Sequence, residues 1–134
     1  MLYAILCYND ETVVESWSKE KDAAVIAARG KVTDRLAARG RLGPVARLMP
    51  TTAATTIRTG KSQAGTSGQE QFVLDGPFAE TKEQLLGFYV VEADSLDEVV
   101  AIAREMKADE PGAFEIRPLR VYMPGSLKTE SAAP

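Results

Sequence analysis

Ionisable side chains gather in one short stretch, residues 75–83, which reads D-G-P-F-A-E-T-K-E. If these groups converge beside a sheet, Asp75 could act as a base whose pKa is raised by burial or by Glu80. Lys82 would then stabilise an enolate-like negative charge. The same groups could instead hold a ligand without any reaction, or could form a capped surface turn whose charges face water.

The backbone of this stretch is constrained by its own residues. Pro77 has a fixed φ angle and suits the first turn of a helix. Gly76 meets the restriction on a residue before proline at little steric cost. The Asp75 carboxylate can accept hydrogen bonds from nearby backbone N–H groups. We therefore expect a rigid corner, followed by one or two helical turns over Ala79–Gln84 with Phe78 as an apolar anchor.

The composition excludes several kinds of chemistry. The 134 residues include no histidine, which rules out imidazole acid–base catalysis, a Ser-His-Asp triad and histidine-ligated metals. Cys7 is the only cysteine, so it forms neither an internal disulfide nor a thiolate metal site, and its apolar neighbours indicate a small core residue. No calcium-loop spacing occurs. We expect no metal and no cofactor.

The elements that position these groups follow from apolar periodicity and turn residues. Ser18 is expected to cap a long helix that ends at Gly40, although Gly30 inside it costs about 1 kcal/mol relative to alanine. Ser95 and Glu98 form a capping box for a second helix that ends near Lys107. Residues 9–17 are read as a loop, Gly43-Pro44 as a chain break and residues 60–69 as a polar loop. Strands are expected at 2–8, 46–59, 71–74, 87–92 and 114–122.

The stretch D-G-P-F-A-E-T-K-E, followed by L-L-G-F-Y-V-V-E-A-D-S-L-D-E-V-V-A-I-A, resembles the DGPF branch of the YCII-related family of small bacterial proteins. Flanking pieces extend the resemblance over most of residues 1–122, read as a single domain, and residues 123–134 are expected to be a disordered tail. The resemblance implies an α+β, ferredoxin-like fold: an antiparallel sheet with two helices on one face, of the dimeric α+β barrel type. It also implies a homodimer. Some family members are encoded beside, or joined to, alternative sigma factors, which suggests a transcription-related protein partner.

Arg29 gains interest from the same resemblance. In another branch of the family, a histidine on this helix is a proposed active-site residue, and Arg29 lies at roughly its position. A guanidinium binds anions but cannot act as a general base, so inherited acid–base chemistry is not expected. With Glu80, Tyr89 and Arg117, Arg29 is expected to bind a ligand in a cleft at one end of the sheet, beside Asp75 and Lys82 as the catalytic candidates.

Three functions remain open at this point. The first is the binding or sensing of a small anionic or carbonyl-bearing molecule. The second is a reaction resembling those of cofactor-free isomerases, lyases and oxygenases, with Asp75 as the base. The third is a regulatory module that binds a protein partner. The net charge of −3 argues against direct nucleic-acid binding. The short apolar run at the N-terminus is neither a signal peptide nor a membrane span, so a cytoplasmic location is expected.

Overall fold

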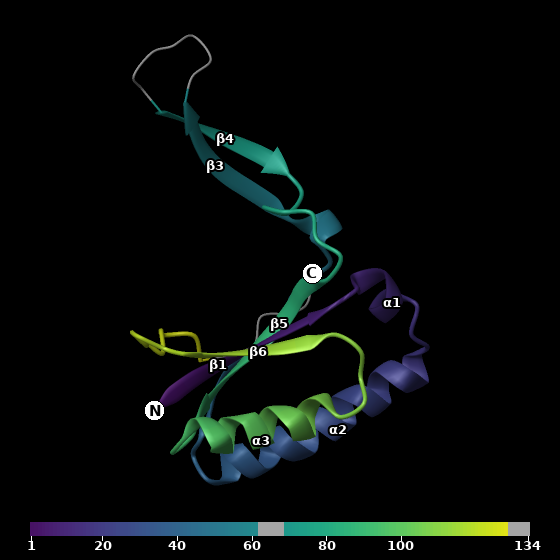
Figure 1. Ribbon diagram of the computed structural model, residues 1–134, viewed down its shortest axis with the longest axis vertical. Coiled ribbons are helices and arrows are strands. Elements are labelled where there is room, and N and C mark those ends of the chain that lie inside the picture. The colour runs from purple at the N-terminus through teal and green to yellow at the C-terminus, as the bar shows by residue number, and fades with distance from the viewer. Residues whose placement is uncertain (62–68, 129–134) are drawn as a thin grey trace.

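The body of the protein is a four-stranded antiparallel sheet with two long helices on one face (Figure 1). The computed structural model describes residues 1–61 and 69–128. Both helices lie below the sheet in Figure 1 and leave its other face without a helix. This arrangement is consistent with the expected ferredoxin-like α+β fold. The strands follow the order β2 (Leu42–Arg47), β5 (Gln84–Glu92), β1 (Leu2–Asn9) and β6 (Ala113–Pro118), and the helices are α2 (Lys19–Ala38) and α3 (Leu96–Lys107).

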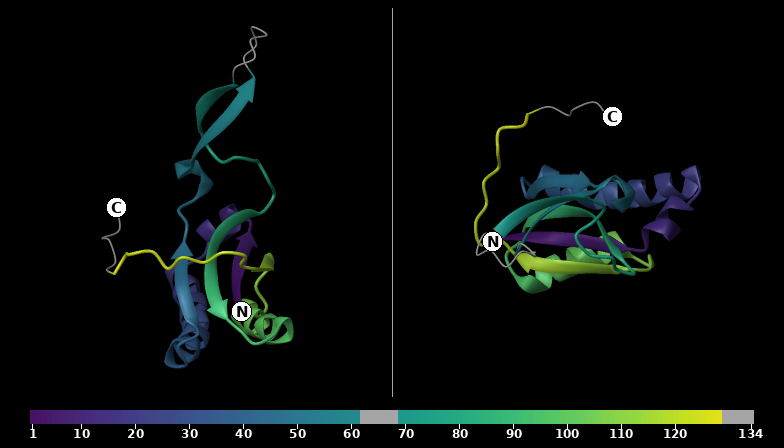
Figure 2. Two further views of the ribbon diagram at one scale, coloured as in Figure 1. Left: turned by 90° about the vertical axis from the view of Figure 1, so that its left-hand side faces the viewer. Right: turned by 90° about the horizontal axis from the view of Figure 1, so that it is seen from above.

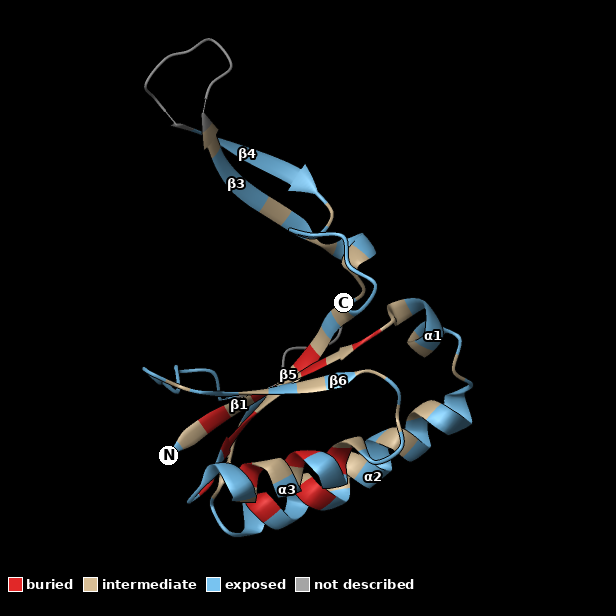
Figure 3. Ribbon diagram, in the orientation of Figure 1, coloured by how far each residue is buried: buried red, intermediate tan, exposed pale blue. Residues whose placement is uncertain are grey.

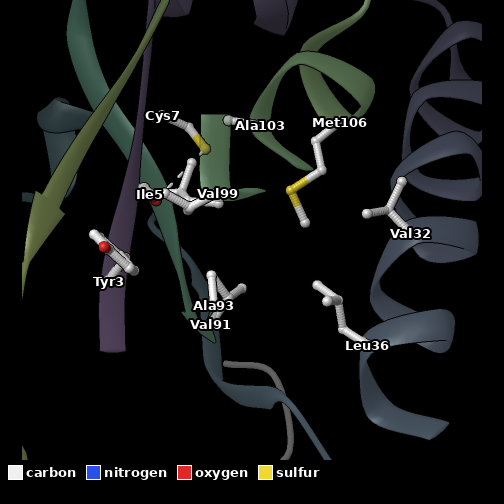
Figure 4. Packing of buried hydrophobic residues seen from close by; sticks show 10 residues of the cluster. All are labelled: Tyr3, Ile5, Cys7, Val32, Leu36, Val91, Ala93, Val99, Ala103 and Met106. Carbon is white, nitrogen blue, oxygen red and sulfur yellow. Dashed lines mark hydrogen bonds between the residues drawn. The ribbon is translucent and has the colours of Figure 1, made fainter. Parts of the chain in front are cut away.

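The core lies between the sheet and the two helices. Strict alternation along β1 buries Tyr3, Ile5 and Cys7 on the helix-facing side, as the sequence predicts. Val91 pairs with Tyr3 in the neighbouring strand and is also fully buried. Figure 4 shows these side chains on one side of the core and those of α2 on the other. The helices supply Val32, Leu36, Val99, Ala103 and Met106.

Both helices begin and end where their local chemistry predicts. The Ser18 hydroxyl accepts a hydrogen bond from the Lys21 N–H, and the Ser95 hydroxyl accepts one from the Glu98 N–H. Helix α2 ends at Ala38, and two residues later Gly40, whose φ of 68° is a left-handed conformation that favours glycine, turns the chain away. None of the helices in the described part of the chain is both long enough and apolar enough to cross a membrane.

A two-stranded hairpin projects from the body between β2 and β5, as two perpendicular views show (Figures 1 and 2). Its strands are β3 (Thr55–Lys61) and β4 (Gln69–Asp75), and the short 3₁₀ helix η1 (Thr51–Ala53) leads into it. Residues 55–60 and 70–75 include no buried side chain, in contrast to the body (Figure 3). The D-G-P-F corner therefore lies at the base of an element that has no core of its own.

Several local expectations are wrong. Residues 79–83 form bends rather than helical turns. The expected loop at 9–17 contains a short helix, α1 (Glu11–Glu15), because Asp10 caps it by accepting a hydrogen bond from the Thr12 N–H. Gly43-Pro44 does not break the chain: a register shift between Leu42 and Val45 accommodates the proline within β2.

The strand expected over 46–59 is divided, because β2 ends at Arg47 and β3 begins only at Thr55. Within the expected 60–69 loop, Gly60 and Lys61 end β3 and Gln69 begins β4, whereas residues 62–68 lie outside the described residues. Of the expected disordered tail, residues 129–134 also lie outside them.

Candidate functional site

A cavity of about 490 Å³ opens between α2 and the helix-facing side of the sheet. The buried residues of α2, Val32 and Leu36, both lie in its C-terminal half, so the N-terminal half stands over open space rather than over packed core. The exposed wall surface is mostly apolar, and the charged residues of the lining form two ion pairs, Arg29–Glu110 and the more exposed Arg47–Asp22. The apolar wall includes Val14, Trp17, Val25, Ile26, Leu42, Val45, Leu86 and Phe114.

Arg29 is the principal charged group of the cavity wall. Its Nη2 donates to both carboxylate oxygens of Glu110, at 3.0 Å and 2.9 Å. Both side chains are largely shielded, with 23% of Arg29 and 15% of Glu110 exposed. The guanidinium carbon lies 5.2 Å from the centre of the Phe114 ring, a cation–π distance. The ion pair therefore joins α2 to the loop that precedes β6.

The Nε atom of Arg29 is buried and has no hydrogen-bond partner within the described residues. A buried donor without an acceptor costs about 1–3 kcal/mol, and most such groups in folded proteins are satisfied. This is the one buried side-chain nitrogen or oxygen of the described residues left in that state. Arg29 thus retains unused capacity to donate a hydrogen bond.

The charge states around Arg29 are set by burial and by its neighbours. Burial lowers the pKa of Arg29, but Tyr89 and Glu110 raise it by more, so the net direction is upward and the guanidinium stays charged. Burial raises the pKa of the Cys7 thiol from its ordinary value of 9.0 to about 11, Arg29 opposes the shift and Glu110 adds to it. A thiol that stays protonated at neutral pH is a poor nucleophile.

These groups suit binding better than acid–base chemistry. Arg29 can donate to a carboxylate or a carbonyl oxygen, whereas both oxygens of Glu110 already accept from Arg29. Cys7 is neutral and lies in the core. Among residues 1–61 and 69–128, no three Cys, Asp or Glu residues are grouped so that they could hold a metal ion.

The structure brings two of the expected site residues together and separates the other four from them. Arg29 and Tyr89 both line the cavity. Asp75, Glu80 and Lys82 are exposed, at the base of the hairpin and in the bends that follow it. Their proposed roles, and the role of Arg117, remain predictions.

Arg117 lies on the opposite face of the sheet. It pairs with Ala4 in the ladder between β1 and β6, and the buried face of β1 belongs to the alternate residues Tyr3, Ile5 and Cys7. By the same reasoning Ile116 lies on the helix-facing side, because it pairs with Ile5 and packs against the core.

Sequence reasoning missed several residues of the cavity. Glu110 lies just before Pro111-Gly112, a position that marks a turn but gives no sign of an ion pair with Arg29. Trp17 was read as part of a loop, and Phe114 as a strand residue without a role in a site. The helical spacing of Asp22, Val25, Ile26 and Arg29, all of which line the cavity, is a signal that could have found this wall.

The fold and the cavity together define a class: a small ferredoxin-like α+β domain with a half-enclosed, mostly apolar cavity under one helix. Comparison with known proteins gives the family. The YCII-related domain matches residues 1–122, and the chain belongs to the YCII-related family. It is also similar to an uncharacterized protein of Rhizobium meliloti (strain 1021), with 52% identity over 129 residues, which cover 95% of this chain and 98% of the relative.

Proposed function

We propose that this protein binds a small molecule that has an apolar body and one anionic or carbonyl-bearing end, in the cavity under α2. The single observation that carries the proposal is the buried Nε atom of Arg29, a donor without an acceptor within the described residues. Because this atom is closed off from solvent, the guanidinium would turn toward the cavity on binding, and a carboxylate or carbonyl oxygen of the ligand would then accept the hydrogen bond. Because the guanidinium is charged, the bond would be of the stronger, charge-assisted kind.

The rest of the cavity supports the same class of ligand. Its volume of about 490 Å³ falls within the usual range for small-molecule sites. Val14 of α1, Val25 and Ile26 of α2, and Phe114 of β6 give the cavity aliphatic and aromatic surface, which favours an apolar body. Glu110 already pairs with Arg29, so the site as a whole is close to neutral before a ligand binds. A ligand with one charge fits this balance better than a multiply charged one.

Matched acid and amide probes test the proposal directly. A panel of monocarboxylates with apolar bodies of graded size, including 4-phenylbutyrate, is titrated beside the corresponding neutral amides by calorimetry. We expect the best acids to bind about tenfold more tightly than their amides, a difference of about 1.4 kcal/mol. Arg29→Gln should abolish the preference, because the amide side chain carries no charge.

Glu110→Gln provides a variant with the opposite expected effect. It removes the carboxylate that competes with a ligand for Arg29 and keeps nearly the same shape, so acids should bind this variant more tightly than the wild type. A panel in which no acid is preferred over its amide would refute the proposal. Equal preference in the wild type and in Arg29→Gln would refute the role of Arg29.

We also propose that two copies of the chain associate. The sheet face without a helix carries Leu2, Leu6 and Phe88, and the hairpin exposes Ile57 and Val73 to 66% and 69%. A two-stranded hairpin without a core is marginally stable on its own, and contact with a second copy of the chain would bury its apolar side chains and stabilise it. Light scattering after size exclusion gives the mass. A dimer supports this proposal, and a monomer at all concentrations would refute it and favour a different, transcription-related protein as the partner.

Two finer assignments rest on sequence features. The D-G-P-F sequence at residues 75–78 supports a place in the DGPF branch of the family. A single buried thiol, Cys7, is compatible with a reducing cytoplasm.

A further inference from the structure

Gly30 lies in the middle of α2 and lines the cavity beside Arg29. A glycine inside a helix is destabilising by about 1 kcal/mol relative to alanine, so its presence calls for a physical reason. Steric crowding does not supply one. Apart from its two chain neighbours and the local helix backbone, no atom lies within 4 Å of the position that its Cβ would occupy.

The other glycines that the structure describes each have a structural reason. Every one of them either has a positive φ or has a neighbouring atom within 3.4 Å of the position of an added Cβ. Gly87, which also lines the cavity, is the clearest contrast, since a Cβ there would lie 2.5 Å from the backbone oxygen of Ala46. Gly87 is required by the sheet, and Gly30 is required by nothing within the described part of the chain.

The empty space at Gly30 belongs to the cavity. Ile26 lies four residues before it and Thr33 three residues after it, on the same face of the helix, and both line the cavity, as does the preceding residue Arg29. A side chain at position 30 would therefore project between Ile26 and Thr33, into the cavity that Arg29 also lines. The hydroxyl of Thr33 donates to the backbone oxygen of Gly30, so it is already satisfied and does not need that space.

We infer that Gly30 is a specificity-determining residue: its missing side chain provides the room for the part of the ligand that adjoins the anionic or carbonyl end. The inference rests on the proposed function and adds a size rule to it. Ligands that are bulky next to the acidic group fit over Gly30, and any larger residue at this position would exclude them. The protein thus retains a less stable helix in exchange for space in its site.

The test compares Gly30→Ala and Gly30→Leu with the wild type for stability and for binding. We expect both variants to melt at higher temperature, by about 3–5 °C for Gly30→Ala, because alanine favours the helix and fills only empty space. Affinity for 4-phenylbutyrate should fall several-fold in Gly30→Ala and at least tenfold in Gly30→Leu. Affinity for acetate, followed by NMR titration, should change less than twofold, because Arg29 is intact.

Asp34→Ala is the matched control, because Asp34 lies on the same helix, is exposed and does not line the cavity. It should also raise the melting temperature, since alanine is the better helix former, and should leave 4-phenylbutyrate binding unchanged. A Gly30→Leu variant that binds 4-phenylbutyrate as tightly as the wild type, or a Gly30→Ala variant that melts at lower temperature, would overturn the inference alone. A wild type that shows no preference for acid over amide would instead overturn the proposed function.

Discussion

The body and the hairpin of this protein treat charged residues in opposite ways. In the body, Arg29 and Glu110 are largely shielded from solvent, paired with each other and placed at a cavity. At the base of the hairpin, Asp75, Glu80 and Lys82 are exposed, and they do not line the cavity under α2. Burial increases the free-energy cost of a polar group that lacks a hydrogen-bond partner, because water no longer takes the place of that partner.

The difference shows what distinguishes a candidate site from a conspicuous motif. The D-G-P-F corner is dense in charge and in backbone constraint, and these properties also suit a solvated turn. The charged residues of the wall around Arg29 are paired with one another, but there one buried donor is left over. In this chain, burial and an unused hydrogen-bonding group point to function more strongly than local charge density does.

The same truncation in the two regions should give the largest contrast. Ile5 is fully buried in the core, whereas 66% of Ile57 on the hairpin is exposed. We expect Ile5→Ala to lower the free energy of unfolding by about 2–5 kcal/mol, from lost burial plus the cavity left behind. Ile57→Ala should change it by less than about 0.5 kcal/mol in the monomer. Urea denaturation at low protein concentration measures both.

Raising the protein concentration extends this comparison. If a second copy covers the hairpin, Ile57→Ala should weaken association. The substitution should then lower the free energy of unfolding only at protein concentrations at which the wild type is a dimer. An Ile57→Ala variant that costs as much as Ile5→Ala at every concentration would show that the hairpin is packed within one chain, contrary to its exposure here.

A smaller effect is expected from the titration of Cys7. Because its pKa in the folded protein, about 11, lies above the ordinary 9.0, the unfolded chain releases the proton first. The stability that this thiol contributes is therefore fully present below pH 9 and is lost as the pH rises toward 11. The difference in unfolding free energy between the wild type and Cys7→Ala should fall by about 1–2 kcal/mol between pH 8 and 10.5.

Moving the thiol to the hairpin gives the control. Thr59 is exposed on β3, so a Thr59→Cys substitution added to Cys7→Ala places a cysteine in water. Its thiol should have the same pKa in the folded and unfolded chains. The double variant should therefore not show the fall in unfolding free energy at high pH that the wild type shows relative to Cys7→Ala. An alkaline loss of equal size from both positions would contradict the burial of Cys7 as its cause.

The sequence was sufficient for the body and insufficient for the site. The caps at Ser18 and Ser95 and the helix stop at Gly40 are local signals, and each is confirmed. The pairing of Arg29 with Glu110 joins residues 81 positions apart, and no local pattern encodes such a contact. The cavity depends on where α2 stops packing against the sheet, which is a property of the tertiary arrangement.

The hairpin shows the opposite limit. Its corner is specified locally, and the position of Asp75 at the end of β4 follows from the sequence. What the corner faces does not follow, because that depends on surfaces outside the segment itself.

The smallest expected effect is that of Asp75→Asn, which tests the comparison most directly. The substitution keeps the shape of an exposed side chain and removes its charge. The free energy of unfolding should therefore be unchanged, and the ratio of acid to amide affinity should stay within twofold of that of the wild type. Arg29→Gln, in the same titration, should lose the preference. If Asp75→Asn instead abolished binding in the dimer while the monomer bound neither probe, the corner of one copy would have to complete the cavity of the other. The proposed contrast between body and hairpin would then hold within one chain and fail in the assembly.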